Sequence, residues 1–215
     1  KQLDVNLITY AGSVWPEPAD HQFNRQGIAL FDLIEPGHLD GLLVWSGGIL
    51  NDYEDIEEFL ARFAGIPLVS VGIKTEQGPS VVLDNYPGMK QQIDRIIEVH
   101  GRRKLAYLSG PDGNLDAQER FQAYIDSLRE HNIPFDPEMV IKCSWGWNNR
   151  ANGGEAIIEL LDRRGIAIDA VVSSCDNLAI GALEELQRRK IRIPDDISLI
   201  GCDNIDECLL VWPQI

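Results

Sequence analysis

The stretch DAVVSSCDNLAIGALEELQRRKIRIPDDISLIGCDN, residues 169–204, contains two apolar strands and the amphipathic helix between them. Both strands are nearly continuous runs of apolar residues, which is typical of parallel strands covered by helices on both faces. Each strand leads into the sequence Cys-Asp-Asn, at residues 175–177 and 202–204. The carboxyl ends of strands in open α/β sheets line the crevice where ligands bind. The repeated ending therefore predicts polar side chains at a binding edge.

The same alternation of apolar runs and amphipathic stretches continues along the rest of the chain. It predicts an α/β fold made of two doubly wound parallel-sheet lobes, with a boundary near residue 101. The N-terminal lobe is expected at 1–101 and the C-terminal lobe at 102–203. Strands are expected near 3–9, 40–45, 67–71, 80–83, 104–108, 139–143, 169–173 and 197–202, and helices near 21–35, 52–64, 86–100, 115–131, 151–164 and 177–190.

Composition and charge disfavour several classes of partner. The net charge of -15 argues against nonspecific contact with nucleic acid or with an anionic membrane, because both need clustered Lys and Arg. No apolar run reaches the ~18 residues that span a bilayer, so no membrane partner is expected. The four cysteines have neither CxxC spacing nor a nearby His, which argues against zinc and predicts free thiols. Free thiols favour a reducing compartment, so we expect a cytoplasmic protein.

Motifs for catalysis are missing from the sequence. The four histidines form no HExxH pattern, and the chain has no GxSxG elbow, no Walker loop and no GxGxxG turn. We therefore expect a binding module with no catalytic residues, no metal and no cofactor, and keep an enzyme on the same scaffold as a remote alternative.

Polar residues that follow strands form the candidate binding site. Asp84 closes VVLDN, Asp203 follows SLIGC, and Arg120 lies early in a helix after a glycine-rich loop. Carboxylates accept hydrogen bonds from hydroxyls, a guanidinium donates a planar fork, and a nearby Trp offers an apolar face. This mixture suits a sugar or a nucleoside. We expect Asp176 to cap the helix that follows it, whereas Asp203 could bind ligand or act as a cap.

Six segments, taken together and in order, resemble the ligand-sensing core of the lactose- and galactose-repressor family (LacI/GalR). They are DGLLVWS (40–46), GIPLVSVG (65–72), VVLDNYPG (81–88), GRRKLAYLSGP (101–111), ERFQAYIDSLREHNIP (119–134) and DAVVSSCDNLAIGALEELQRRKIRIPDDISLIGCDNI (169–205). The resemblance implies a periplasmic-binding-protein-like fold with an effector in the cleft between two lobes. It also implies that residues 204–215 begin a crossover back to the first lobe. The lobes are expected to be incomplete, with the natural protein extending beyond both ends.

The resemblance assigns roles to individual residues. The family's arginine falls on Arg120 of RFQAY, its ligand-contacting aspartate on Asp203, and the aspartate of its V-x-x-D-N segment on Asp84. The aromatic residue that stacks on the sugar falls on Trp147 or Trp145. One departure concerns Cys175, which stands where the family presents an amide, so the identity of the ligand is in doubt. Ser46, in the loop after a strand, completes the candidate ligand-binding set.

The function implied is that of a non-catalytic sensor in a bacterial transcriptional regulator. A small polar ligand is expected to bridge Asp84 on one side with Arg120, Trp147 and Asp203 on the other, and to signal by rearranging the lobes. A homodimer is expected, with DNA bound only through a headpiece absent from this chain. Two alternatives stay open: the same core attached to a histidine kinase or cyclase, and an extracytoplasmic sugar-binding protein of a transporter.

Overall fold

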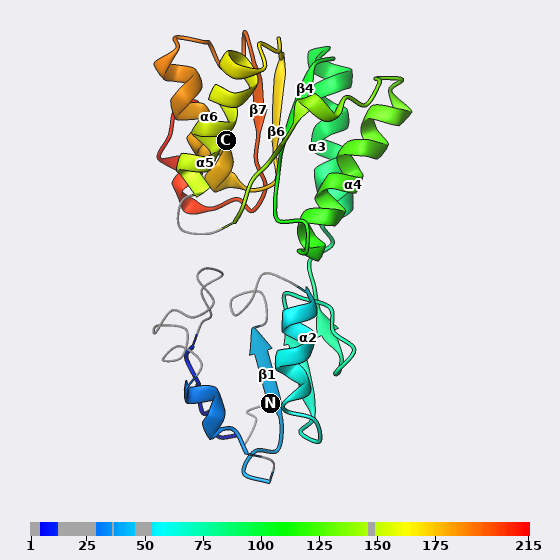
Figure 1. Cartoon of the computed structure of the whole chain (residues 1–215), viewed down its shortest axis with the longest axis vertical. Coiled ribbons are helices and arrows are strands. Elements are labelled where there is room, and N and C mark those ends of the chain that lie inside the picture. Colours follow the sequence, from blue (N-terminus) through cyan, green and yellow to red (C-terminus); the bar gives the residue numbers. More distant parts are fainter. Residues whose placement is uncertain (1–4, 13–28, 36, 46–52, 146–148) are drawn as a thin grey trace. The chain divides into compact units, whose positions relative to one another are not determined.

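The computed structural model describes residues 5–12, 29–35, 37–45, 53–145 and 149–215, which form two compact units (Figure 1). The first unit is residues 1–83 and the second is residues 84–215. The division falls before the expected boundary near residue 101. The reason is that helix α3 (Asn85–His100) buries its apolar face against α4 (Leu115–Glu130) and a strand of the second unit.

The first unit contains a small parallel sheet in the order β1-β2-β3. Its strands are β1 (Leu42–Trp45), β2 (Leu68–Val71) and β3 (Ser80–Val81), paired from Leu42 opposite Leu68 onward. Helix α2 (Tyr53–Ala61) carries the buried apolar residues Ile56, Phe59 and Leu60. The ring of Phe59 meets that of Phe31 edge-on, with centroids 5.2 Å apart.

One expectation for the N-terminal part differs from the structure, and another lies largely outside the described residues. Residues 5–9 belong to the strand expected at 3–9, but this described part of the chain adopts no strand conformation. Of the helix expected at 21–35, residues 21–28 lie outside the described residues, Ala29 is helical, and Leu30–Leu33 form a 3₁₀ helix. A strand needs a hydrogen-bonded neighbour, which an apolar sequence pattern alone does not guarantee.

The second unit is built on a four-stranded parallel sheet in the order β5-β4-β6-β7. The strands are β4 (Leu105–Ser109), β5 (Val140–Lys142), β6 (Ala170–Ser173) and β7 (Ser198–Ile200). Every residue of β4 and β6 is buried, as predicted for central strands covered on both faces. The carboxyl ends of all four strands lie at one edge because all of the pairings are parallel.

Helices cover both faces of this sheet (Figure 1). Helices α3 and α4 cover one face over a core that includes Ile93, Tyr107 and Tyr124. The other face is covered by α5 (Asn149–Ile158), which continues as a π-helical turn at Glu159–Arg163, and by α6 (Asp176–Arg188). The parallel sheets and flanking helices confirm the predicted α/β class.

Helices α5 and α6 touch each other backbone to backbone. A Cβ atom added at Gly181 would lie 1.8 Å from the carbonyl oxygen of Arg150, and one at Gly153 would lie 2.0 Å from that of Leu178. Only glycine fits at these two positions, so the two helices dock closely and hold the segment that begins at Cys175 in place. Across the residues that the structure describes, no helix is long and apolar enough to cross a membrane.

Candidate functional site: the carboxyl edge of the second sheet

Arg120 lies at the centre of the polar groups that gather at the carboxyl edge of the second sheet. Its side chain comes from α4, whose first turn is capped by the Asn114 side chain, which accepts from the Ala117 backbone N–H at 3.0 Å. The guanidinium is buried, with only 3% of the residue exposed. Nε donates to Oδ1 of Asn85 at 2.9 Å, and another nitrogen donates to the carbonyl of Ser174 at 2.6 Å.

The third partner of Arg120 is Asp203, whose Oδ1 lies 3.0 Å from a guanidinium nitrogen. The arginine therefore ties together the start of α3, the loop after β6 and the loop after β7. Three of its five N–H donors have partners within the described residues, which leaves donors for a bound molecule.

Trp145, just after β5, packs over the guanidinium of Arg120. The ring centroid lies 5.3 Å from the guanidinium carbon, close enough for a cation–π interaction. The indole N–H donates to Oγ of Ser174 at 3.2 Å. Gly110 leaves room for this ring, because a Cβ atom there would lie 2.5 Å from it. Trp145 is thus held at the edge with one end polar and one face apolar.

Asp203 combines partial exposure with an unusual backbone conformation. Its φ is +119°, in a region that side chains other than glycine rarely adopt, and 37% of its side chain is exposed. Burial raises the pKa of its carboxyl group, and the nearby charge of Arg120 partly opposes this rise. The carboxylate is therefore positioned by Arg120 while part of it still faces solvent.

Asp176 holds the loop that carries Asp203. The N-cap residue of α6 is Cys175, so the expectation that Asp176 caps this helix is wrong. Instead, Oδ2 of the buried Asp176 accepts from the backbone N–H of Ile205 at 3.0 Å, and its own N–H donates to the carbonyl of Cys202 at 2.8 Å. The Asp176 carboxylate therefore stabilises the turn that follows β7.

The structure buries the thiol of Cys175 among apolar side chains. The residue is 6% exposed and belongs to the apolar cluster with Leu108, Cys143 and Leu178. Burial raises the pKa of its thiol to about 11, so the sulfur is protonated at neutral pH. All four cysteines are free thiols, as their spacing predicted.

Asn85, which the sequence did not single out, lies beside Arg120, whereas its neighbour Asp84 was the expected ligand-binding residue of this segment. Asp84 is the exposed N-cap residue of α3 and makes no side-chain capping bond. Asn85 is buried, and its amide group donates to Oδ1 of Asp116 at 2.9 Å while accepting from Arg120. The sequence feature that could have pointed to Asn85 is its position beside Asp84 in VVLDN. No sequence rule predicts which of two adjacent side chains faces Arg120.

The remaining candidates divide between described and undescribed parts of the chain. Ser46 and Trp147 lie outside the described residues. Asp116, a further residue that the sequence did not single out, is half-buried, and burial raises the pKa of its carboxyl group while Arg120 opposes the rise. No group of three or more His, Cys, Asp and Glu side chains suited to a metal occurs in the described ranges.

A separate cavity of about 280 Å³ lies between β5 and α5 and does not include Arg120. Its charged side chains are already paired. Arg163 contacts Glu155 at 2.5 Å and Glu159 at 3.1 Å. Lys142, which also lines it, contacts Asp112. We therefore place the candidate site at the Arg120 edge, where buried polar groups converge, and not in this cavity.

The comparisons with known proteins point to one family. The family model described as a periplasmic binding protein-like domain matches residues 97–215. The transcriptional regulator CelR of Thermobifida fusca is 32% identical over 171 residues, which cover 78% of this chain and 48% of that protein. The repressor CytR of Escherichia coli is 28% identical over 204 residues, which cover 95% of this chain and 58% of that protein.

Solved structures agree with these relatives. A sugar-binding transcriptional regulator of the LacI family from Escherichia coli, complexed with phosphate, superposes with a TM-score of 0.70 at 25% identity, covering 89% of this chain and 66% of that one. The cellobiose complex of the regulator CelR superposes with a TM-score of 0.70 at 30% identity, covering 83% of this chain and 53% of that one. The chain spans about half the length of the curated relatives it matches.

Proposed function

The chain belongs to the periplasmic binding protein-like domain family, and from this we propose that it is the ligand-sensing core of a LacI-type transcriptional regulator. The relatives and solved structures named above are transcriptional regulators, which favours this function over a kinase-linked sensor or a transporter's binding protein. The core itself is non-catalytic and acts by binding.

The observation that carries the proposal is the buried Arg120 held between Asn85 and Asp203, with Trp145 over it. A buried guanidinium fixed on three sides is a rigid donor, and the partly exposed carboxylate of Asp203 is an acceptor beside it. The indole of Trp145 adds an apolar face on which a ring can pack. Fixed donors, acceptors and one aromatic face suit a sugar or a nucleoside.

The relatives support the same class of ligand. The solved complex of CelR contains cellobiose, a neutral sugar. For this chain we propose a small polar effector of the sugar or nucleoside class. No metal or organic cofactor is required for such binding.

Signalling follows from preferential binding. A ligand shifts a conformational equilibrium only when it binds one state more tightly than the other. We expect the effector to favour one conformation of a homodimeric, cytoplasmic protein, and a separate basic headpiece to bind DNA. The charge of -15 on this chain fits such a division of roles, because acidic surfaces repel the phosphate backbone.

A thermal-shift screen tests the binding function. The panel contains monosaccharides, disaccharides including cellobiose, nucleosides and purine bases. A ligand at 100 times its dissociation constant stabilises the folded state by about 2.7 kcal/mol, so a true effector raises the melting temperature clearly. A panel in which no compound shifts the transition contradicts the proposal.

Reading the gene upstream of Lys1 tests the regulatory part. A helix-turn-helix segment there is the expected result. A lipoprotein signal sequence, or a reading frame that joins a kinase module, would instead assign the core to one of the alternatives.

A further inference from the structure

The carboxyl edge of the second sheet carries an acidic balance even though its central residue is an arginine. Asp203 pairs with Arg120 directly. Asp116 and Glu119 both accept from the amide of Asn85, at 2.9 Å and 3.4 Å, and Asn85 in turn accepts from Arg120. One guanidinium and three carboxylates therefore belong to this hydrogen-bond network of described residues, and their formal charges sum to a negative value.

The positive charge of Arg120 already forms an ion pair with Asp203. Only 4% of its side chain is exposed, and one of its nitrogens lies 3.0 Å from the partly exposed carboxylate of Asp203. An anionic ligand at the remaining N–H donors of Arg120 would lie close to the Asp203 carboxylate, and the two negative charges would repel each other.

Asp116 is the carboxylate whose interaction with a ligand should depend most on the charge of that ligand. One of its oxygens accepts from Asn85, and the other has no hydrogen-bond partner among the residues that the structure describes. The side chain is half-buried, so water screens its charge less than on an open surface. A free acceptor in this position can take an O–H or N–H from a ligand but repels a phosphate or a carboxylate.

We infer that the effector of this site carries no negative charge, that it presents a hydroxyl or amino donor to Asp116, and that Asp116 is the residue that excludes acidic ligands. The inference rests on the proposed function, because it assumes that the Arg120 edge is the effector site. Neutral sugars, amino sugars and nucleosides fit it. Uronic acids, sugar phosphates and nucleotides do not.

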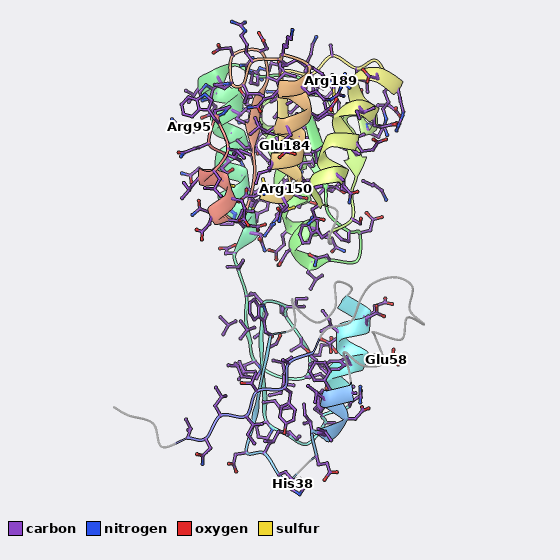
Figure 2. All side chains as sticks on the ribbon, turned by 90° about the vertical axis from the view of Figure 1, so that its left-hand side faces the viewer. His38, Glu58, Arg95, Arg150, Glu184 and Arg189 are labelled. Atoms are coloured by element: carbon purple, nitrogen blue, oxygen red, sulfur yellow. The ribbon has the colours of Figure 1, made fainter. Side chains whose placement is uncertain are left out.

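Matched ligand sets provide the test. The sets are glucose, glucosamine and glucuronate; galactose, galactosamine and galacturonate; cellobiose and cellobionate; and adenosine and adenosine monophosphate. Each is titrated into the full-length wild-type protein and into two variants, Asp116→Asn and Glu184→Gln. Both variants change an acid to its amide, but Glu184 lies on the exposed side of α6 (Figure 2). Circular dichroism and the unliganded melting temperature verify that both variants are folded.

In every set that binds, we expect the neutral or amino member to bind wild type about tenfold or more tightly than the acidic member, the size expected for one added charge close to a partly buried carboxylate. Asp116→Asn should bring the ratio of the two affinities closer to one, whereas Glu184→Gln should leave that ratio unchanged. An acidic member that binds wild type as well as its neutral counterpart overturns the inference and leaves the proposed function standing. A ratio that Asp116→Asn does not change overturns the role of Asp116. Binding by no member overturns the inference together with the proposed function.

Discussion

At the scale of single residues, Arg120 determines which groups meet at the carboxyl edge of the second sheet. Its three partners come from three separate segments, and each contact is between 2.6 and 3.0 Å. The sequence predicted Arg120 and Asp203 because both fall in motifs shared with a known family. It did not predict Asn85 or Asp116, because their contacts depend on how α3 and α4 pack. The sequence predicted different roles for Asp176 and Asp203, but it did not predict that Asp176 accepts from the backbone N–H of Ile205.

The two central tyrosines give a matched pair of stability predictions. Tyr107 and Tyr124 stack with ring centroids 4.8 Å apart in the same core. The hydroxyl of Tyr124 donates to the carbonyl of Leu105 at 2.9 Å, whereas the buried hydroxyl of Tyr107 has no partner within the described residues. We expect Tyr124→Phe to cost about 1 kcal/mol of unfolding free energy and Tyr107→Phe to be neutral or stabilising.

Urea denaturation of both variants measures this difference. The shared ring packing cancels in the comparison, because each substitution removes only a hydroxyl. A larger loss for Tyr107→Phe than for Tyr124→Phe would show that the Tyr107 hydroxyl has a favourable interaction in the folded protein.

Ligand binding should depend on pH through Asp203. Burial raises the pKa of this carboxyl group above its usual range near 3.9. An ionised carboxylate accepts a hydrogen bond from a ligand hydroxyl more strongly than a neutral carboxyl group does, so binding favours the deprotonated form. Affinity should therefore be highest near neutral pH and fall as the pH is lowered through the raised pKa, at a higher pH than for an ordinary aspartate.

Titrations between about pH 4 and pH 8 measure this dependence. Asp203→Asn should bind the ligand more weakly at neutral pH, and its affinity should fall less than that of wild type as the pH is lowered. Burial also raises the pKa of Asp116, so the fall in affinity that remains in Asp203→Asn should come from Asp116. If wild type and Asp203→Asn show the same pH profile, the carboxylate of Asp203 does not contact the ligand.

At the scale of helices and strands, the second unit was largely predictable, and so were β1, β2, β3 and α2 of the first unit, whereas the strand expected at 3–9 was not found in the described residues. The apolar runs expected as strands near 169–173 and 197–202 correspond to β6 and β7, and the helix expected at 177–190 corresponds to α6. Buried parallel strands leave a strong apolar signal, whereas a strand such as the one expected at 3–9 depends on a neighbour. The close docking of α5 and α6 could not be predicted, because glycines within helices have several explanations.

Three glycines test the docking of α5 and α6. A methyl group at Gly181 or Gly153 would overlap backbone of the facing helix, whereas one at Gly154 would sit 3.5 Å from the carbonyl of Gly181, an ordinary contact. Gly181→Ala and Gly153→Ala should each destabilise by about 1–3 kcal/mol or more, despite alanine's better helix propensity. Gly154→Ala should be neutral or stabilise by up to about 1 kcal/mol.

Chemical denaturation of the three variants distinguishes the effect of steric overlap between the helices from the effect of alanine's helix propensity. Since Cys175 and Asp176 begin α6, the two damaging substitutions should also weaken ligand binding by displacing the turn that carries Asp203. Equal stability for all three variants would mean that the helices separate without cost.

At the scale of the whole molecule, the second unit contains the described part of the candidate binding site of the proposed sensor core. The family model matches residues 97–215, and these residues include Asp116, Arg120, Trp145 and Asp203. Asn85 adds the start of α3, the first helix of the same unit. The acidic net charge and the acidic edge both fit a neutral or positively charged effector.

The central claim is that the Arg120 edge binds the effector, and calorimetric titration tests it most directly. The strongest compound from the screen is titrated into wild type, Arg120→Ala, Arg120→Lys and Arg95→Ala, with near-UV circular dichroism to verify folding. Arg95 is a matched control because it is an exposed arginine on α3 (Figure 2). Arg120→Ala should lose roughly 1.5–3 kcal/mol of binding free energy and Arg120→Lys somewhat less, while Arg95→Ala binds as wild type does. A folded Arg120→Ala variant that binds with wild-type affinity would contradict the account.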